Sequence, residues 1–275
     1  MYQRSLSQTE AKVILSMEAE GKEQVSLSEI RKRAGVSGGF ARLLAHRLIR
    51  KGWLQRLRRG IYLLNPSRHG PDALPDTDPL RIGSRLVSPY YFGFATAAEL
   101  EGLLPQASRV YYLVTTARPN AIGNRAFQFR FVRVTGSRFF GSRKMRRRGQ
   151  ELMVSDLERT VLDCLTRPEM SGGMAGVAHI IALAKPRLSW SRLGSHLHRV
   201  GNRSLELRTG FLMEQVRPSL PPPAAWLRKF QAKVDDQYVP LGPPKAHGRR
   251  GPRDRRWHVI QNVPRALLFA EGEIR

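Results

Sequence analysis

The stretch SLSEIRKRAGVSGGFARLLAHRLIRKGWLQRLRRGIYLLNP, residues 26–66, decides the fold of the first part of the chain. Ser26 and Glu29 have the S-x-x-E spacing of a capping box, which predicts a helix that starts at Ser26. Gly35 can take the left-handed conformation that ends a helix, and Ser37 can cap the next one. Two helices across so short a turn predict a helix-turn-helix.

The second helix of the pair, predicted over residues 37–51, should have a buried face and a face open to a partner. The apolar residues expected in the buried stripe are Phe40, Leu43, Leu44 and Leu48. The residues expected on the opposite face are Ala41, Arg42, Ala45 and His46. Small side chains let a helix approach base edges closely, and an arginine can bind guanine in the major groove, so we expect Arg42 to contact a base. Gly38 and Gly39 expose backbone N–H groups that suit a phosphate.

Two short strand-like runs, 53–57 and 61–64, follow this helix and flank Arg58, Arg59 and Gly60. Gly60 supplies the left-handed turn residue of a β-hairpin, and a hairpin tipped by arginines is a wing. The sequence therefore predicts a winged helix-turn-helix. A further helix, expected from about Ser7 to Glu20, should support the recognition pair.

The predicted winged helix is strongly basic, because no Asp or Glu lies between Arg31 and Arg59 while ten Lys and Arg residues do. Motif and charge together favour double-stranded DNA as the partner. An interaction module for an acidic protein is the alternative. The residues expected to contact DNA are Arg31, Lys32, Ser37, Gly38, Gly39, Arg42, His46, Arg50, Arg56, Arg58 and Arg59.

The whole chain is also basic, with a formal net charge of +25 over 275 residues. Such a field attracts phosphate polyanions and makes binding depend on salt. No apolar run approaches the roughly 20 residues that span a bilayer, and charged residues interrupt any signal-peptide core near the N-terminus. Cys164 is the only cysteine, which excludes an intrachain disulfide. We expect a cytoplasmic protein that does not bind membranes and carries no cofactor.

The rest of the chain predicts a mixed α/β (α+β) fold, larger than the N-terminal domain. Residues 67–79 are rich in Pro and Asp and predict a linker between a DNA-binding domain, 1–66, and an α/β domain, 80–275. The expected helices are 88–104, 154–165 with Ser155 as its cap, 176–184, 189–200 and 203–216, and the expected strands are 109–116 and 127–134. Residues 218–256 are rich in Pro and Gly and predict an extended, partly mobile tail that rejoins the domain at 257–263. Its basic part, 241–256, is either a third nucleic-acid contact or a poorly ordered charged segment.

A dense basic cluster within residues 139–148 predicts either a second nucleic-acid patch or a flexible solvated loop. Its members are Arg143, Lys144, Arg146, Arg147 and Arg148. The one tight acidic group is Asp156, Glu158 and Asp163, of which two fit helix capping. Nucleotide-binding, hydrolase and zinc-protease motifs are absent from the sequence, so we expect neither catalytic nor metal-ligating residues. A metal-dependent nucleic-acid enzyme using Asp156 and Glu158 is the alternative.

Four segments resemble the AbiEi-type antitoxins, the regulatory partners in two-gene abortive-infection toxin-antitoxin systems. They are KGWLQRLRRGIYLL at 51–64, ATAAELEGL at 95–103, YYLVTTARP at 111–119 and VSDLERTVLDCLTRPEMSGG at 154–173. The resemblance implies an N-terminal domain that represses its own operon at inverted repeats. It also implies a C-terminal domain that counters a nucleotidyltransferase-like toxin, and leaves direct contact with that toxin open. The basic segment from Lys245 departs from the family pattern.

Overall fold

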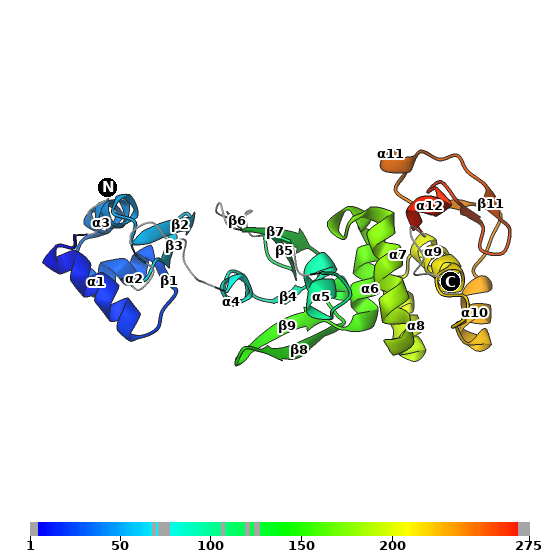
Figure 1. Ribbon diagram of the computed structural model, residues 1–275, viewed down its shortest axis with the longest axis horizontal. Coiled ribbons are helices and arrows are strands. Elements are labelled where there is room, and N and C mark those ends of the chain that lie inside the picture. The colour runs from blue at the N-terminus through cyan, green and yellow to red at the C-terminus, as the bar shows by residue number, and fades with distance from the viewer. Residues whose placement is uncertain are drawn as a thin grey trace. The chain divides into compact units, whose positions relative to one another are not determined.

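The computed structural model describes residues 5–67, 70, 78–105, 108–118, 122–123 and 127–268 (Figure 1). The chain forms two compact units. The first comprises Met1–Ser88, Arg109–Tyr111 and Pro119–Phe131, and the second comprises Pro89–Ser108, Tyr112–Arg118 and Val132–Arg275. Most of the linker predicted at 67–79 lies outside the described residues, so the domain boundary there stays a prediction. None of the described helices is long and apolar enough to cross a membrane.

The helices of the first unit begin and end where local signals predicted. These are α1 (Gln8–Ala19), α2 (Leu27–Ala34) and α3 (Gly38–Arg50). The unit also contains a short helix that was not predicted, α4 (Pro79–Gly83). The capping box before α2 is formed: the Ser26 hydroxyl accepts from Glu29 N at 3.1 Å, and the Glu29 carboxylate accepts from Ser26 N at 2.8 Å. Gly35 ends α2 with φ of 67°. A second capping box, between Ser7 and Glu10, starts α1.

A three-stranded antiparallel sheet completes the winged helix. Its strands are β1 (Gln24–Ser26), β2 (Leu54–Arg58) and β3 (Ile61–Leu64), in the order β1-β3-β2. Gly60 turns the β2–β3 hairpin with φ of 76°, as predicted. Strand β1 was not predicted, because its three residues are recognisable only through their pairing with β3. The core under these elements contains Val13, Ile14, Met17, Ile30, Leu44, Leu48 and Trp53.

The larger sheet has six strands in the order β6-β7-β5-β4-β9-β8. They are β4 (Tyr90–Phe92), β5 (Val110–Thr115), β6 (Ile122–Gly123), β7 (Gln128–Arg133), β8 (Ser142–Arg147) and β9 (Gln150–Ser155). The two predicted strands correspond to β5 and β7. Strand β4 corrects the prediction of a helix from residue 88: Tyr91 and Phe92 are buried in the sheet, and α5 (Phe94–Leu100) begins only after them. Pro89, read as the first residue of a helix, precedes a strand instead.

The segment before α6 (Leu157–Thr166) differs from the prediction in two ways. Strand β8 occupies most of 139–148 and pairs with β9 along its length, which excludes the flexible loop. The cap of α6 is Asp156, whose carboxylate accepts from Arg159 N at 2.7 Å. Ser155 is the last residue of β9, and its hydroxyl lies 2.7 Å from the Thr160 hydroxyl. The pairing of β9 with β8 and β4 therefore moves the helix start by one residue.

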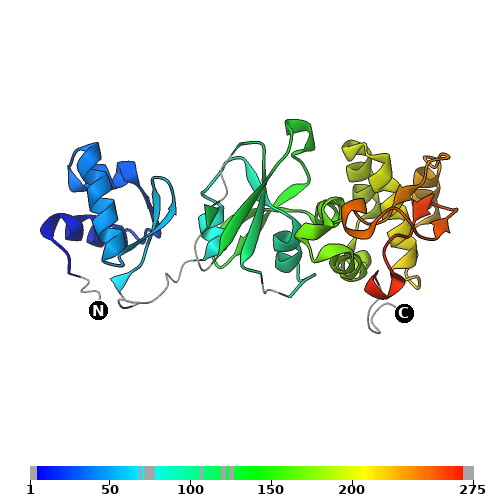
Figure 2. The same ribbon diagram turned by 90° about the horizontal axis from the view of Figure 1, so that it is seen from above.

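A group of helices follows the sheet in the chain and lies beside β4, β5 and β9 in both views (Figures 1 and 2). They are α6, α7 (Gly173–Ala184), α8 (Trp190–Val200), α9 (Arg203–Gln215) and α10 (Ala224–Gln231), with 3₁₀ turns Pro168–Met170 and Lys185–Arg187. A further 3₁₀ turn, Gly136–Arg138, connects β7 to β8. The three helices predicted after residue 173 are confirmed. Buried Lys185 donates to the carbonyls of Met213, Val216 and Arg217 at 2.6, 2.6 and 2.9 Å and so satisfies the end of α9. Burial lowers the pKa of Lys185 to about 8.

The basic C-terminal segment is folded onto these helices, which corrects the expectation of an extended, partly mobile tail. It forms β10 (Val239–Pro240), α11 (Pro244–His247), β11 (Arg253–Asp254), β12 (Val259–Ile260) and α12 (Arg265–Leu268), with the strands in the order β10-β12-β11. Trp257 anchors it: the side chain is 1% exposed and its Nε1 donates to Glu214 at 2.5 Å. A Cβ at Gly210 in α9 would lie 2.1 Å from the Trp257 ring, so glycine makes room for the indole.

Candidate nucleic-acid interface

Helix α3 carries the residues expected to read DNA, and its buried face differs in phase from the prediction. The buried residues are Ala41, Leu44, Ala45 and Leu48, none of them more than 2% exposed. Their spacing of i, i+3, i+4 and i+7 is that of one helical face. Phe40 and Leu43, expected inside, are 41% and 45% exposed. Both sets have helical spacing, and the prediction was wrong because it took Phe40 and Leu43 as core residues where the smaller Ala41 and Ala45 are packed instead.

The outer face of α3 keeps its expected polar members but gains apolar ones. Arg42, His46 and Arg50 are exposed, while Ala41 and Ala45, expected beside Arg42, point into the core. Leu43 takes their place on the outer face, and Phe40 lies under the guanidinium of Arg47, 6.0 Å from the ring centroid. An exposed leucine between Arg42 and His46 suits the methyl group of a thymine. The sequence signal that could have revealed Leu43 is the i, i+3, i+4, i+7 spacing of Ala41, Leu44, Ala45 and Leu48, which leaves Leu43 outside.

The start of α3 and the end of α2 add donors around this face. Ser37 caps α3 by accepting from Phe40 N at 3.4 Å, and Gly38 and Gly39 follow with exposed backbone. No acidic residue lies in the first turn of α3, so its partial positive charge is available to an anion. Arg31 and Lys32 are exposed in the last turn of α2.

The wing supplies the second element of the interface. Arg56 on β2 and Arg59 at the hairpin tip are exposed. The backbone of Arg58 belongs to β2, but its side chain lies outside the described part of the structure. The strand register shifts between Arg56 and Arg58, which increases the local twist of the hairpin. The wing thus presents cations on an irregular turn rather than on a flat strand edge.

Ion pairs inside the first unit separate the basic residues into two groups. Arg33 donates to both oxygens of Glu20 at 2.9 and 2.6 Å, and Lys51 donates to Glu10 at 2.6 Å. These two cations, counted in the basic run, are therefore neutralised within the fold. Within the described residues, no ion pair or side-chain hydrogen bond engages the remaining candidate cations. They are Arg31, Lys32, Arg42, Arg50, Arg56 and Arg59.

The second basic cluster lies on the β8–β9 hairpin and is partly neutralised. Arg143 pairs with Glu101, and Lys144 pairs with Glu151 at 2.8 Å. Arg147 acts on Glu99, whose pKa burial raises to about 7. Arg146 and Arg148 are exposed. The net positive charge of this hairpin is thus smaller than its sequence indicates, and its role as a nucleic-acid patch stays a proposal.

The three acidic residues considered for catalysis are each engaged by neighbouring groups. Asp156 caps α6 and contacts His196 Nε2 at 2.9 Å, and Glu158 accepts from Ser189 N at 2.6 Å. Asp163 accepts from Arg159 Nε at 2.9 Å. Over the ranges that the structure describes, no three His, Cys, Asp or Glu side chains come together to hold a metal ion. These contacts leave Asp156 and Glu158 without the shared orientation that the metal-dependent alternative requires.

Comparison with known proteins bears on this first unit. Residues 13–65 match the family model described as "Transcriptional regulator, AbiEi antitoxin". The chain is also similar in fold to a solved structure, the RV2827C protein from Mycobacterium tuberculosis, with 17% sequence identity, coverage of 97% of this chain and 96% of that one, and a TM-score of 0.69. Among curated proteins, none matches. The segment that matches this family of transcriptional regulators, residues 13–65, holds α2, α3 and the wing.

Proposed function

We propose that this protein is an antitoxin-like autorepressor that binds duplex DNA at inverted repeats through its winged helix. The observation that carries the proposal is the outer face of α3, where Arg42, His46 and Arg50 are exposed and no acidic side chain of the described residues engages the two arginines. In a helix-turn-helix, the outer face of the second helix enters the major groove. Cations without an ion-pair partner in the protein can bind DNA phosphates, and this binding releases the counterions condensed on the DNA.

The two elements of the interface have different tasks in this proposal. Arg42, on the outer face of α3 next to Leu43 in the chain, reads a base edge, because an arginine binds guanine O6 and N7 and a leucine packs on a thymine methyl. Arg59, at the tip of the wing, holds a phosphate and carries no sequence information. Binding therefore weakens steeply as salt rises, while the preference for one sequence depends on α3.

The test is DNA footprinting and fluorescence anisotropy with purified protein and the DNA upstream of its own gene. Protection of an inverted repeat is expected. Arg42→Ala should lose about 1–3 kcal/mol of discrimination between this repeat and unrelated DNA. Arg59→Ala should weaken binding to both by a similar factor. Arg228→Ala, which removes an exposed arginine from α10, is the matched control and should leave binding unchanged. Absence of any protected repeat would refute the repressor.

The second half of the proposal is that the protein counters a nucleotidyltransferase-like toxin. The family of the N-terminal segment supports this role. The test is growth of cells that express the product of the adjacent gene, with and without this protein. Rescue of growth supports the antitoxin role, and co-purification from the same cells decides whether the two proteins bind each other. Toxicity that the full chain fails to relieve would refute it.

A further inference from the structure

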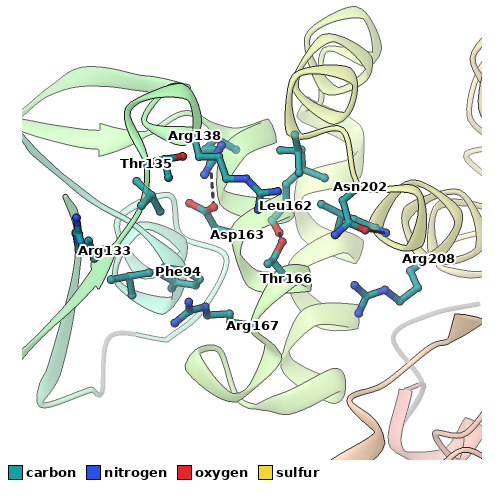
Figure 3. Close-up of a pocket in the computed structure, with 15 residues that line it drawn as sticks. Phe94, Arg133, Thr135, Arg138, Leu162, Asp163, Thr166, Arg167, Asn202 and Arg208 are labelled. Carbon is teal, nitrogen blue, oxygen red and sulfur yellow. Dashed lines mark hydrogen bonds and ion pairs between the residues drawn. The ribbon is translucent and has the colours of Figure 1, made fainter. Parts of the chain in front are cut away.

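A cavity of about 340 Å³ lies in the second unit, away from the winged helix (Figure 3). Its walls come from the end of β7, the turn after it, α5, α6, and the segment from the end of α8 into α9. The volume falls within the range of sites that hold small organic ligands. Neither the proposed DNA binding nor the acidic residues discussed above explains this cavity.

Arginines from separate elements surround the cavity. Figure 3 shows Arg133 on β7, Arg138 in the following 3₁₀ turn, Arg167 after the end of α6, and Arg208 on α9 reaching toward the end of α6. Because these residues are distant in sequence, only the fold brings them to one site. Arg159 on α6 also lines it.

The charges in the cavity do not balance. Its one carboxylate, Asp163, is paired with Arg159 at 2.9 Å. Across the described ranges, no ion pair or side-chain hydrogen bond engages Arg133, Arg138 or Arg167. Arg208 donates from Nε to the carbonyl of Ser204 at 3.1 Å, and burial without a nearby carboxylate lowers its pKa. Four guanidinium groups therefore line one cavity, and no carboxylate among the described residues pairs with them.

Two buried features of the cavity wall carry an energetic cost. Arg159 is 5% exposed, and its Nη1 is buried without a hydrogen-bond partner. Phe94 is 3% exposed and has φ of 54°, a left-handed conformation that a bulky residue rarely adopts. Strain of this kind is concentrated at ligand-binding sites, where it fixes a side chain in place.

The remaining wall is apolar. Besides Phe94, it includes Val132, Leu162, Val200 and Leu205. A site that combines several guanidinium groups with an apolar surface is complementary to a ligand that has both an anionic and a flat, weakly polar part. Inorganic phosphate would use only the first of these features.

We infer that this cavity binds a small phosphate ester that carries a flat ring, of the class of the nucleoside 5′-monophosphates. Arg208 and Arg167, which both line the cavity around the end of α6, supply positive charge for the phosphate. The ring packs on the apolar wall near Phe94. The protein would then have a small-molecule site in its second unit in addition to the proposed DNA interface in its first.

Isothermal titration calorimetry of the full chain with AMP, GMP, CMP and UMP tests the inference. At least one of them should bind with saturation below millimolar concentration. The same nucleoside without phosphate, and inorganic phosphate alone, should each bind at least about tenfold more weakly. Arg208→Gln and Arg167→Gln should each weaken the nucleotide about tenfold or more, because each removes a charge-assisted hydrogen bond.

Two controls separate the cavity from the other basic surfaces. Arg228→Gln removes an exposed arginine elsewhere in the second unit, and Arg42→Gln removes one from α3; both should leave nucleotide binding unchanged. Arg167 is exposed, so its variant should fold even if the Arg208 variant does not, and circular dichroism checks both. The inference is overturned if no nucleotide saturates, if phosphate alone binds equally well, or if only Arg42→Gln abolishes binding.

Discussion

Leu43 and Leu44 are neighbours in α3, yet the structure places them on opposite faces. Leu44 is 2% exposed in the core of the winged helix, whereas Leu43 is 45% exposed. Replacing a fully buried leucine by alanine removes its transfer free energy and leaves a cavity, which costs about 2–5 kcal/mol. The same change at a half-exposed position costs less than about 1 kcal/mol, and the higher helix propensity of alanine offsets part of that.

Leu44→Ala should therefore destabilise the winged helix by at least about 2 kcal/mol more than Leu43→Ala. Hydrogen exchange of the α3 amides is the suitable assay, because it reports the opening of this unit without contributions from the second unit. DNA binding should show the reverse order at temperatures where both variants are folded, with Leu43→Ala losing affinity for the repeat. Equal destabilisation by the two substitutions would refute the placement of the α3 faces.

Two further predictions concern stability. Burial of Glu29 acts to raise its pKa, but hydrogen bonds from Ser26 and Lys22 outweigh burial and lower it to about 2. A carboxylate whose pKa is lowered by folding stabilises the fold at pH values above its ordinary pKa of 4.5. This stabilisation is lost as the pH falls toward 2. Since the Glu29 side chain is 40% exposed, Glu29→Gln should lower the free energy of unfolding by only about 1 kcal/mol at pH 7 and by nothing near pH 2. Hydrogen exchange of the α2 amides measures this difference. A difference that stays constant between pH 7 and pH 2 would contradict the link between the Glu29 pKa and stability. Gly210→Ala should lower the free energy of unfolding by about 1–3 kcal/mol in urea denaturation, because the added methyl overlaps the Trp257 ring. Gly39→Ala makes the same change at a helical position with open space around its Cα, and it measures the backbone contribution alone.

The sequence by itself determined the parts of this protein that depend on short-range contacts. The signals that mark the ends of these elements act within four residues. They are the capping box of Ser26 and Glu29, the left-handed Gly35 and the hairpin glycine Gly60, and their local contacts do not depend on what the element later packs against. They were enough to place α2, α3 and the wing. The polar half of the recognition face followed from them, because Arg42 and His46 are one turn apart on α3.

Only the tertiary structure decided the features that depend on what each segment packs against. Strand β4 replaces the start of a helix because Tyr91 and Phe92 are buried between β5 and β9. The folded C-terminal segment depends on the space that Gly210 leaves for Trp257, 47 residues later in the chain (257 − 210). The pairing of Arg33 with Glu20 and the clustering of four arginines around one cavity are likewise long-range. Burial and charge pairing are properties of neighbours in space, and a linear pattern specifies neighbours only when they are also close along the chain.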